Sequence, residues 1–136
     1  MKILLIGNGA REHCIAWKIL QSPLCSELIV APGNPGTEEI AENVDISIDD
    51  TNKLHEFAIS SKFDLVIIGP EAPIEAGLSN LLIDSGIKVF GPTKEAGMLE
   101  TSKSFAKMLM KKNNIPTAKF EVFTDIVDAK DYLDQI

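Results

Sequence analysis

The chain has 136 residues, 45% of them hydrophobic, which fits one compact domain and part of a second. This composition excludes a disordered tail, and no apolar stretch is long enough for a membrane span or a signal peptide. The formal net charge of -7 argues against nucleic acid or an anionic membrane as a partner, although a local group of N–H donors can still bind a small anion.

Short apolar runs alternate with longer amphipathic stretches over the first 90 residues. The predicted strands are residues 3–6, 28–31, 44–48, 65–68 and 88–90. The predicted helices are residues 12–21, a helix capped by Asp49 or Asp50 that continues through Ala58, and a helix from Ile74 to Gly86. This order predicts an α/β fold with an open, doubly wound parallel sheet, right-handed crossovers and the first strand at its centre.

The pattern changes after Gly91. Helical spacing is found between Ser102 and Asn114, residues 119–123 fit a strand, and a last helix begins at Asp125. We interpret residues 1–102 as one domain and residues 103–136 as the beginning of a second domain that is cut short.

The segment Gly7-Asn8-Gly9 follows the first strand and precedes the first helix. Two glycines at such a turn let a ligand approach the backbone, and the N–H groups at a helix start attract anions. Arg11 adds a guanidinium that can bind a phosphate through two hydrogen bonds. These features predict one bound phosphate that meets the N–H groups from Gly9 onward. The alternative is that the glycines only make a tight turn.

A dinucleotide is not expected at this turn. Glu12 stands where the third glycine of the dinucleotide fingerprint would be, and its charge would repel a pyrophosphate. The second strand ends in Val30-Ala-Pro-Gly33, without the acidic residue that binds a ribose in those proteins. The sequence therefore argues against NAD.

A second candidate loop, Gly69-Pro70-Glu71, follows the strand at residues 65–68. Ligands of doubly wound sheets bind beyond the carboxyl ends of the central strands, so Glu71 is predicted to face the same crevice as the glycine turn. Pro70 stiffens the loop, and the Glu71 carboxylate suits ribose hydroxyls or an amine. The alternative is a solvated loop glutamate.

Two further polar residues leave alternatives open. Asn34, in Pro-Gly-Asn-Pro-Gly, either contacts the ligand or forms an Asx turn. His13 lies one turn into the first helix and is either a ligand contact or a packing residue.

Six motifs together resemble the glycinamide ribonucleotide synthetases, also called phosphoribosylamine–glycine ligases, in order and with compatible spacing. They are Gly-Asn-Gly-Ala-Arg-Glu-His at 7–13, Ala-Pro-Gly-Asn-Pro-Gly-Thr at 31–37, Gly-Pro-Glu-Ala-Pro at 69–73, Phe-Gly-Pro-Thr at 90–93, Leu-Glu-Thr-Ser-Lys at 99–103 and Ile-Pro-Thr at 115–117. The first motif more often has glycine where Ala10 stands.

The resemblance implies an ATP-grasp ligase of de novo purine synthesis that joins glycine to 5-phosphoribosylamine and uses ATP and Mg²⁺. It implies that residues 1–102 are the domain that precedes the ATP-grasp region and contribute to the phosphoribosylamine site. The substrate-binding residues are then Gly7, Asn8, Gly9, Arg11, Asn34, Pro70 and Glu71. Lys103 corresponds to a lysine near the nucleotide phosphates, with a solvated lysine at a helix start as the alternative.

The family enzymes continue well beyond residue 136, so no catalytic residue and no metal ligand is assigned here, and the chain alone is expected to be inactive. We expect small-molecule substrates, no nucleic acid or membrane partner, and a monomer. Cys14 and Cys25 lack metal-ligand spacing and fit a reducing cytoplasm. The competing hypothesis is a non-catalytic, phosphate-binding or regulatory Rossmann-like module.

Overall fold

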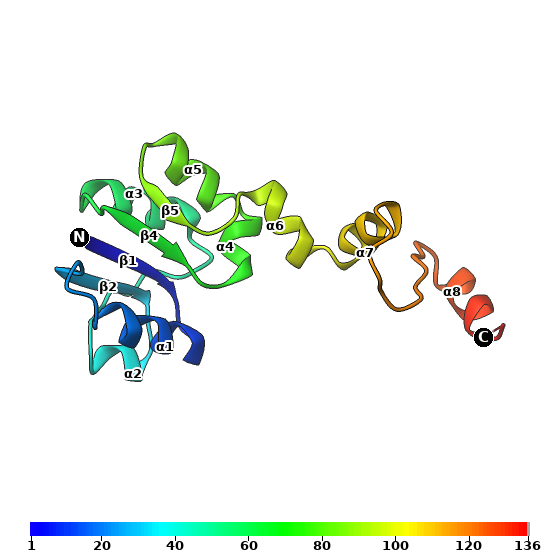
Figure 1. Cartoon of the computed structure of the whole chain (residues 1–136), viewed down its shortest axis with the longest axis horizontal. Helices are drawn as coiled ribbons and strands as arrows, with labels where there is room; N and C mark the ends of the chain where they lie inside the picture. The colour runs from blue at the N-terminus through cyan, green and yellow to red at the C-terminus, as the bar shows by residue number, and fades with distance from the viewer. Residues whose placement is uncertain (136) are drawn as a thin grey trace. The chain divides into compact units, whose positions relative to one another are not determined.

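The computed structural model describes residues 1–135 and divides into two compact units. The first, Met1–Thr101, is called the N-terminal unit, and the second unit begins at Ser102. The elements of the N-terminal unit are β1 (Lys2–Gly7), α1 (Ala10–Ile19), β2 (Glu27–Pro32), α2 (Pro35–Glu38), β3 (Glu42–Asn43), α3 (Thr51–Ser60), β4 (Leu65–Ile68), α4 (Glu71–Glu75), α5 (Leu78–Asp84), β5 (Lys88–Phe90) and α6 (Lys94–Thr101) (Figure 1).

The five strands form one parallel sheet in the order β3-β2-β1-β4-β5. In Figure 1, the dark blue β1 lies between β2 and β4. Leu4, for example, pairs with Ile29 on one side and with Val66 on the other. The predicted α/β fold with a central first strand is therefore confirmed, and the carboxyl ends of β1 and β4 are neighbours.

Helices cover both faces of this sheet. On one face, Leu4 and Ile6 pack in a core cluster with residues of α3 and α5. On the other face, Ile3 and Leu5 pack with Ala16 of α1. A strand that is buried on both faces has no polar side, which explains the continuous apolar run of β1. Each fully buried leucine contributes about 1.5–3 kcal/mol relative to exposure, so the two clusters fix β1 and the turn that follows it.

Two predicted elements of this unit differ from the structure. The third strand is Glu42–Asn43, not residues 44–48. The Val44 N–H still donates to the Val30 carbonyl, but the Ile46 N–H turns back to the carbonyl of Val44. The alternation in this segment reflects contact with the core. The side chains of Val44, Ile46 and Ile48 pack against it, although the segment is not paired as a β-strand.

The helix predicted from Ile74 to Gly86 is instead two helices, α4 and α5. They are separated at Gly77, whose φ of 90° lies in the left-handed region that glycine adopts most easily. The helix α6, from Lys94 to Thr101, was not predicted as a separate element.

The second unit contains α7 (Lys103–Lys112) and α8 (Ile126–Leu133). Ser102 and Asp125 cap these helices by accepting the N–H groups of Phe105 and Val127. Residues 119–123 are not a strand, because they pair with no strand in the part of the chain that the structure describes, and β structure requires such a partner.

None of the helices within residues 1–135 is long and apolar enough to cross a membrane.

Candidate functional site

The glycine turn connects β1 to α1. Gly7 has a φ of +137°, a backbone conformation that residues with a Cβ rarely adopt. Gly9 is the N-cap of α1. The next N–H groups, those of Ala10 and Arg11, have no acceptor within the helix, as at any helix start. The predicted tight turn is therefore present, and the N–H groups of Ala10 and Arg11 begin the helix.

The Glu12 side chain turns back into this site. It is only 3% exposed, and its Oε2 accepts the Gly9 N–H over 2.7 Å. Its Oε1 accepts the Nε–H of Arg11 over 2.9 Å. A phosphate at the Gly9 N–H, as predicted from the sequence, would have to displace this carboxylate. The sequence indicated repulsion of a pyrophosphate by Glu12, but not this direct contact.

Arg11 also reaches the second candidate loop. Its Nη1 lies 3.4 Å from Oε1 of Glu71, the first residue of α4. Both side chains are about half-exposed, at 54% for Arg11 and 49% for Glu71. Because β1 and β4 are neighbours, their carboxyl ends bring these side chains together at one edge of the sheet. The structure thus places Arg11 and Glu71 as a pair that a ligand can approach.

Both groups are charged at neutral pH. A hydrogen bond from its own backbone N–H, followed by the Arg11 guanidinium, holds the pKa of the Glu71 carboxyl below its usual range. The hydrogen bond to Glu12 raises the pKa of Arg11 above its ordinary value. The ionised Glu71 carboxylate can therefore accept hydrogen bonds from hydroxyl or amine donors.

Asn34 is the N-cap of α2, and its side chain also forms hydrogen bonds with the glycine turn. Its Oδ1 accepts the N–H groups of Gly36 and Thr37, which is the Asx-type alternative that the sequence left open. Its Nδ2 donates to the carbonyls of Asn8 and Gly9, over 3.0 Å in both cases. All four hydrogen-bonding positions of the amide are used inside the protein, so Asn34 positions the turn.

Thr37 is a site-supporting residue that sequence reasoning missed. It is fully buried, and its hydroxyl accepts the Asn34 N–H over 2.8 Å and also lies 2.8 Å from Oδ1 of Asn43. The signal that could have found it is the spacing of three residues from an Asn N-cap, typical of reciprocal capping.

Pro70 and His13 are the remaining candidates of this unit, and both have structural roles. Pro70 is the N-cap residue of α4 and precedes Glu71. The ring of His13 packs on Gly36, where an added Cβ would lie 2.6 Å from Nδ1, which favours the packing interpretation.

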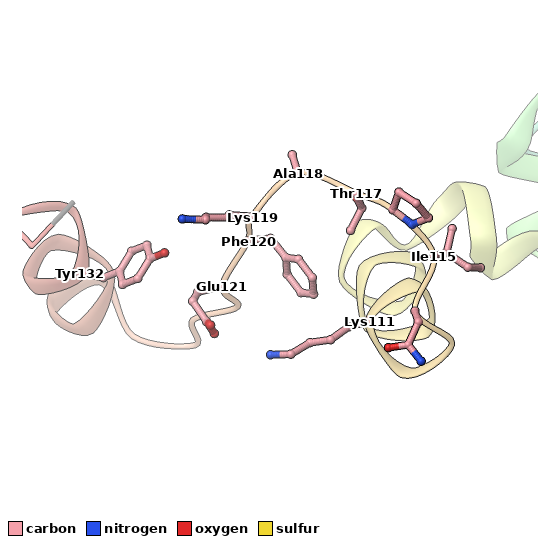
Figure 2. Close-up of a pocket in the computed structure, with 10 residues that line it drawn as sticks. Lys111, Ile115, Thr117, Ala118, Lys119, Phe120, Glu121 and Tyr132 are labelled. Atoms are coloured by element: carbon pink, nitrogen blue, oxygen red, sulfur yellow. The ribbon is translucent and has the colours of Figure 1, made fainter.

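Lys103 is the first residue of α7 in the second unit. It lines a hollow of about 200 Å³ with Lys107 and Phe120. A neighbouring hollow of about 500 Å³ extends from Lys111 to Tyr132, and Figure 2 shows the Phe120 ring and the Lys111 side chain at it. The Nζ atoms of Lys107 and Lys111 lie 5.7 and 5.8 Å from the centre of that ring. Both ammonium groups are close enough to the Phe120 ring for cation–π contact.

Within residues 1–135, no three His, Cys, Asp or Glu side chains are grouped to hold a metal ion. The described residues therefore do not fit a magnesium site.

A parallel sheet in the order β3-β2-β1-β4-β5, with helices on both faces, defines a Rossmann-like α/β domain. The chain belongs to the family of phosphoribosylglycinamide synthetase N domains, which matches residues 1–100. The family resemblance inferred from the six motifs is thereby confirmed.

Curated relatives carry the name phosphoribosylamine–glycine ligase. The protein from Pasteurella multocida (strain Pm70) is 49% identical over 135 residues, and that from Nostoc sp. (strain PCC 7120) is 44% identical over 135 residues. Each match covers 98% of this chain but only 32% of the relative. The chain therefore spans about a third of the length of these relatives.

Solved structures agree. The crystal structure of phosphoribosylamine–glycine ligase from Thermotoga maritima superposes with a TM-score of 0.74 at 29% identity, over 99% of this chain and 30% of that one. N5-carboxyaminoimidazole ribonucleotide synthetase from the same organism also gives 0.74, over 96% of this chain and 36% of that one. At 18% identity, the latter supports the fold alone.

Proposed function

We propose that this chain is the N-terminal portion of an ATP-dependent ligase that joins glycine to 5-phosphoribosylamine. The products are glycinamide ribonucleotide, ADP and phosphate. The proposal is supported by the family match, by relatives of that name at 44–49% identity, and by the motifs that follow the neighbouring strands β1 and β4. In such a reaction, ATP phosphorylates the glycine carboxylate, and the amine of phosphoribosylamine then displaces phosphate from the acyl phosphate.

The observation that carries the site is the approach of Arg11 to Glu71 across neighbouring strand ends, at 3.4 Å. We place phosphoribosylamine in this crevice, with its ribose hydroxyls donating to the Glu71 carboxylate. Its phosphate would be met by the guanidinium of Arg11 and by first-turn N–H groups that Glu12 leaves free. Gly7, Asn8, Gly9, Asn34 and Pro70 would hold these groups in place.

Residues 103–136 are proposed to begin the ATP-grasp region, with residues 1–102 as the domain before it. Lys103 would contact the nucleotide phosphates, since it opens a helix beside Lys107 in a part of the chain rich in exposed cations. ATP and Mg²⁺ would be held mainly by residues outside this chain. The whole enzyme is proposed to be a monomer of the cytoplasm.

The test is an assay of the full-length protein that contains this chain, with glycine, ATP and phosphoribosylamine. We expect glycinamide ribonucleotide and an equal amount of ADP. The purified 136-residue chain should release no ADP in response to glycine, because acyl phosphate formation needs metal-bridged phosphates and a closing lid. A full-length protein without this product would favour the alternative, a non-catalytic phosphate-binding or regulatory module.

A further inference from the structure

The Glu12 side chain fills a space whose walls are three glycines from two loops. A Cβ added at Gly7 would lie 2.5 Å from Cγ of Glu12, and one at Gly9 would lie 2.9 Å from Oε2. A Cβ added at Gly69 would overlap Oε1. The absence of side chains at these glycines leaves room for a carboxylate of the chain itself.

In a dinucleotide-binding turn, the corresponding glycines let a pyrophosphate approach the N–H groups at the helix start. Here the Gly9 N–H is already bound by the carboxylate of Glu12, at 2.7 Å. A buried carboxylate requires such partners, and a second anion at the same N–H would meet its negative charge at contact distance. The Glu12 carboxylate therefore prevents a diphosphate from binding at the glycine turn.

The same carboxylate orients Arg11, which is the single arginine of the chain. Oε1 of Glu12 accepts the Nε–H over 2.9 Å, which restricts rotation of the guanidinium. The Nη groups carry the remaining four N–H donors, and Nη1 lies 3.4 Å from Glu71. Glu12 thus binds one edge of the guanidinium and leaves the other edge for the crevice.

We propose that Glu12 is the positioning residue of the phosphoribosylamine site. It acts through the hydrogen bonds of its carboxylate to the turn and to Arg11. It occupies the Gly9 N–H itself and fixes Arg11 opposite Glu71, so that the substrate meets the guanidinium, Glu71 and the first-turn N–H groups that Glu12 leaves free. This inference rests on the proposed function for its substrate, but the fixed position of Arg11 can be tested without it.

The first test is NMR spectroscopy of the 136-residue chain labelled with ¹⁵N. The single Arg11 Nε–H should exchange with water at least about tenfold more slowly than in a free arginine, because it is held in a charge-assisted hydrogen bond. Glu12→Gln should remove this protection. Asp50→Asn is the matched control, since it neutralises a different carboxylate, 2.8 Å from Lys53, and retains a good N-cap residue. This control should leave the Arg11 signal unchanged.

The second test is steady-state kinetics of the full-length enzyme. Glu12→Gln should raise the KM for phosphoribosylamine about tenfold and leave kcat and the KM for ATP within about twofold. In an Arg11→Ala background, the same substitution should have almost no further effect, because the residues act as one unit. A purely structural role would lower the melting temperature without this selective and non-additive change.

The proposal is overturned if Glu12→Gln leaves Arg11 protected, or if its KM effect adds fully to that of Arg11→Ala. A wild-type enzyme that makes no glycinamide ribonucleotide would instead reject the proposed function, while the NMR experiment would still decide whether Glu12 positions Arg11.

Discussion

The N-terminal unit and the second unit bury their apolar side chains very differently. The N-terminal unit has two core clusters, one on each face of the sheet. In the second unit as far as residue 135, Ala106 is the one hydrophobic residue that is buried. Other apolar side chains of α7 and α8 are exposed, with Met108 at 62% and Leu133 at 65%.

This difference indicates that the two units depend on different interactions. The sheet of the N-terminal unit is stabilised by burial on both faces, and this burial holds the glycine turn and Glu71 in register. The helices of the second unit rely on caps such as Ser102 and on local contacts, which contribute about 0.5–2 kcal/mol each. A site built on the sheet can therefore be rigid in the chain as it stands.

Leu4→Ala should cause the largest loss of stability and so test the difference in burial between the two units. Leu4 is fully buried in the central strand, so we expect a loss of about 2–5 kcal/mol in the free energy of unfolding. Leu133→Ala, at an exposed position of α8, should change it by no more than about 0.5 kcal/mol. Urea denaturation followed by circular dichroism measures both. Equal losses would show that the second unit is as tightly packed as the first.

Gly69→Ala tests how crowded the interior of the site is. The added methyl would collide with the Glu12 carboxylate, so we expect a cost of about 1–3 kcal/mol. If that collision is the cause, the cost should fall below about 1 kcal/mol in a Glu12→Ala background. Thermal unfolding of the single and double variants measures it, and a cost that does not change in the double variant would assign the strain to another contact.

Ser79→Ala tests whether the buried hydroxyl on α5 lacks a hydrogen-bond partner. The Ser79 hydroxyl is fully buried and has no hydrogen-bond partner among the described residues. Its removal should leave stability unchanged or raise it by up to about 1 kcal/mol. Ser85→Ala at the end of the same helix is the matched control, because it loses 2.8 Å hydrogen bonds with the Leu81 carbonyl and with Nε2 of His55 and should cost about 1 kcal/mol or more. Equal losses in both variants would contradict the assignment of Ser79 as unpaired.

Arg11→Ala should have the smallest effect, on the titration of Glu71. The pKa of this carboxyl should rise toward its usual range but stay below it, since the bond from its own N–H remains. A lowered folded-state pKa contributes stability above the unfolded-state pKa, and this contribution is lost as pH falls through the folded-state pKa. The variant should therefore lose less stability on acidification than the wild type. An NMR titration that shows the same Glu71 pKa in both proteins would contradict the pairing.

The central sheet could be predicted because β1 and β4 are continuous apolar runs of strand length. Since the carboxyl ends of neighbouring parallel strands meet at one edge of a sheet, the sequence also predicts that the glycine turn and Glu71 lie close together, and the Arg11–Glu71 contact agrees with this. The break at Gly77 was missed because apolar spacing continues across it, although glycine permits the left-handed conformation that separates the helices.

The inward turn of Glu12 could not be predicted from local pattern. A charged residue at the start of a helix is ordinarily exposed, and its burial here depends on Gly69, which is distant in sequence. The same limit applies to Asn34, because its bonds to the carbonyls of Asn8 and Gly9 join two loops that only the folded sheet brings together.

The most direct test of the proposed site is the kinetics of Glu71→Ala in the full-length enzyme. The variant should weaken the use of phosphoribosylamine about ten- to a hundredfold, as expected for lost charge-assisted bonds to the ribose hydroxyls. The KM for ATP should stay nearly unchanged, and Glu75→Ala on the same helix should behave as the wild type. Normal phosphoribosylamine kinetics in a correctly folded Glu71→Ala enzyme would contradict the assignment of the crevice.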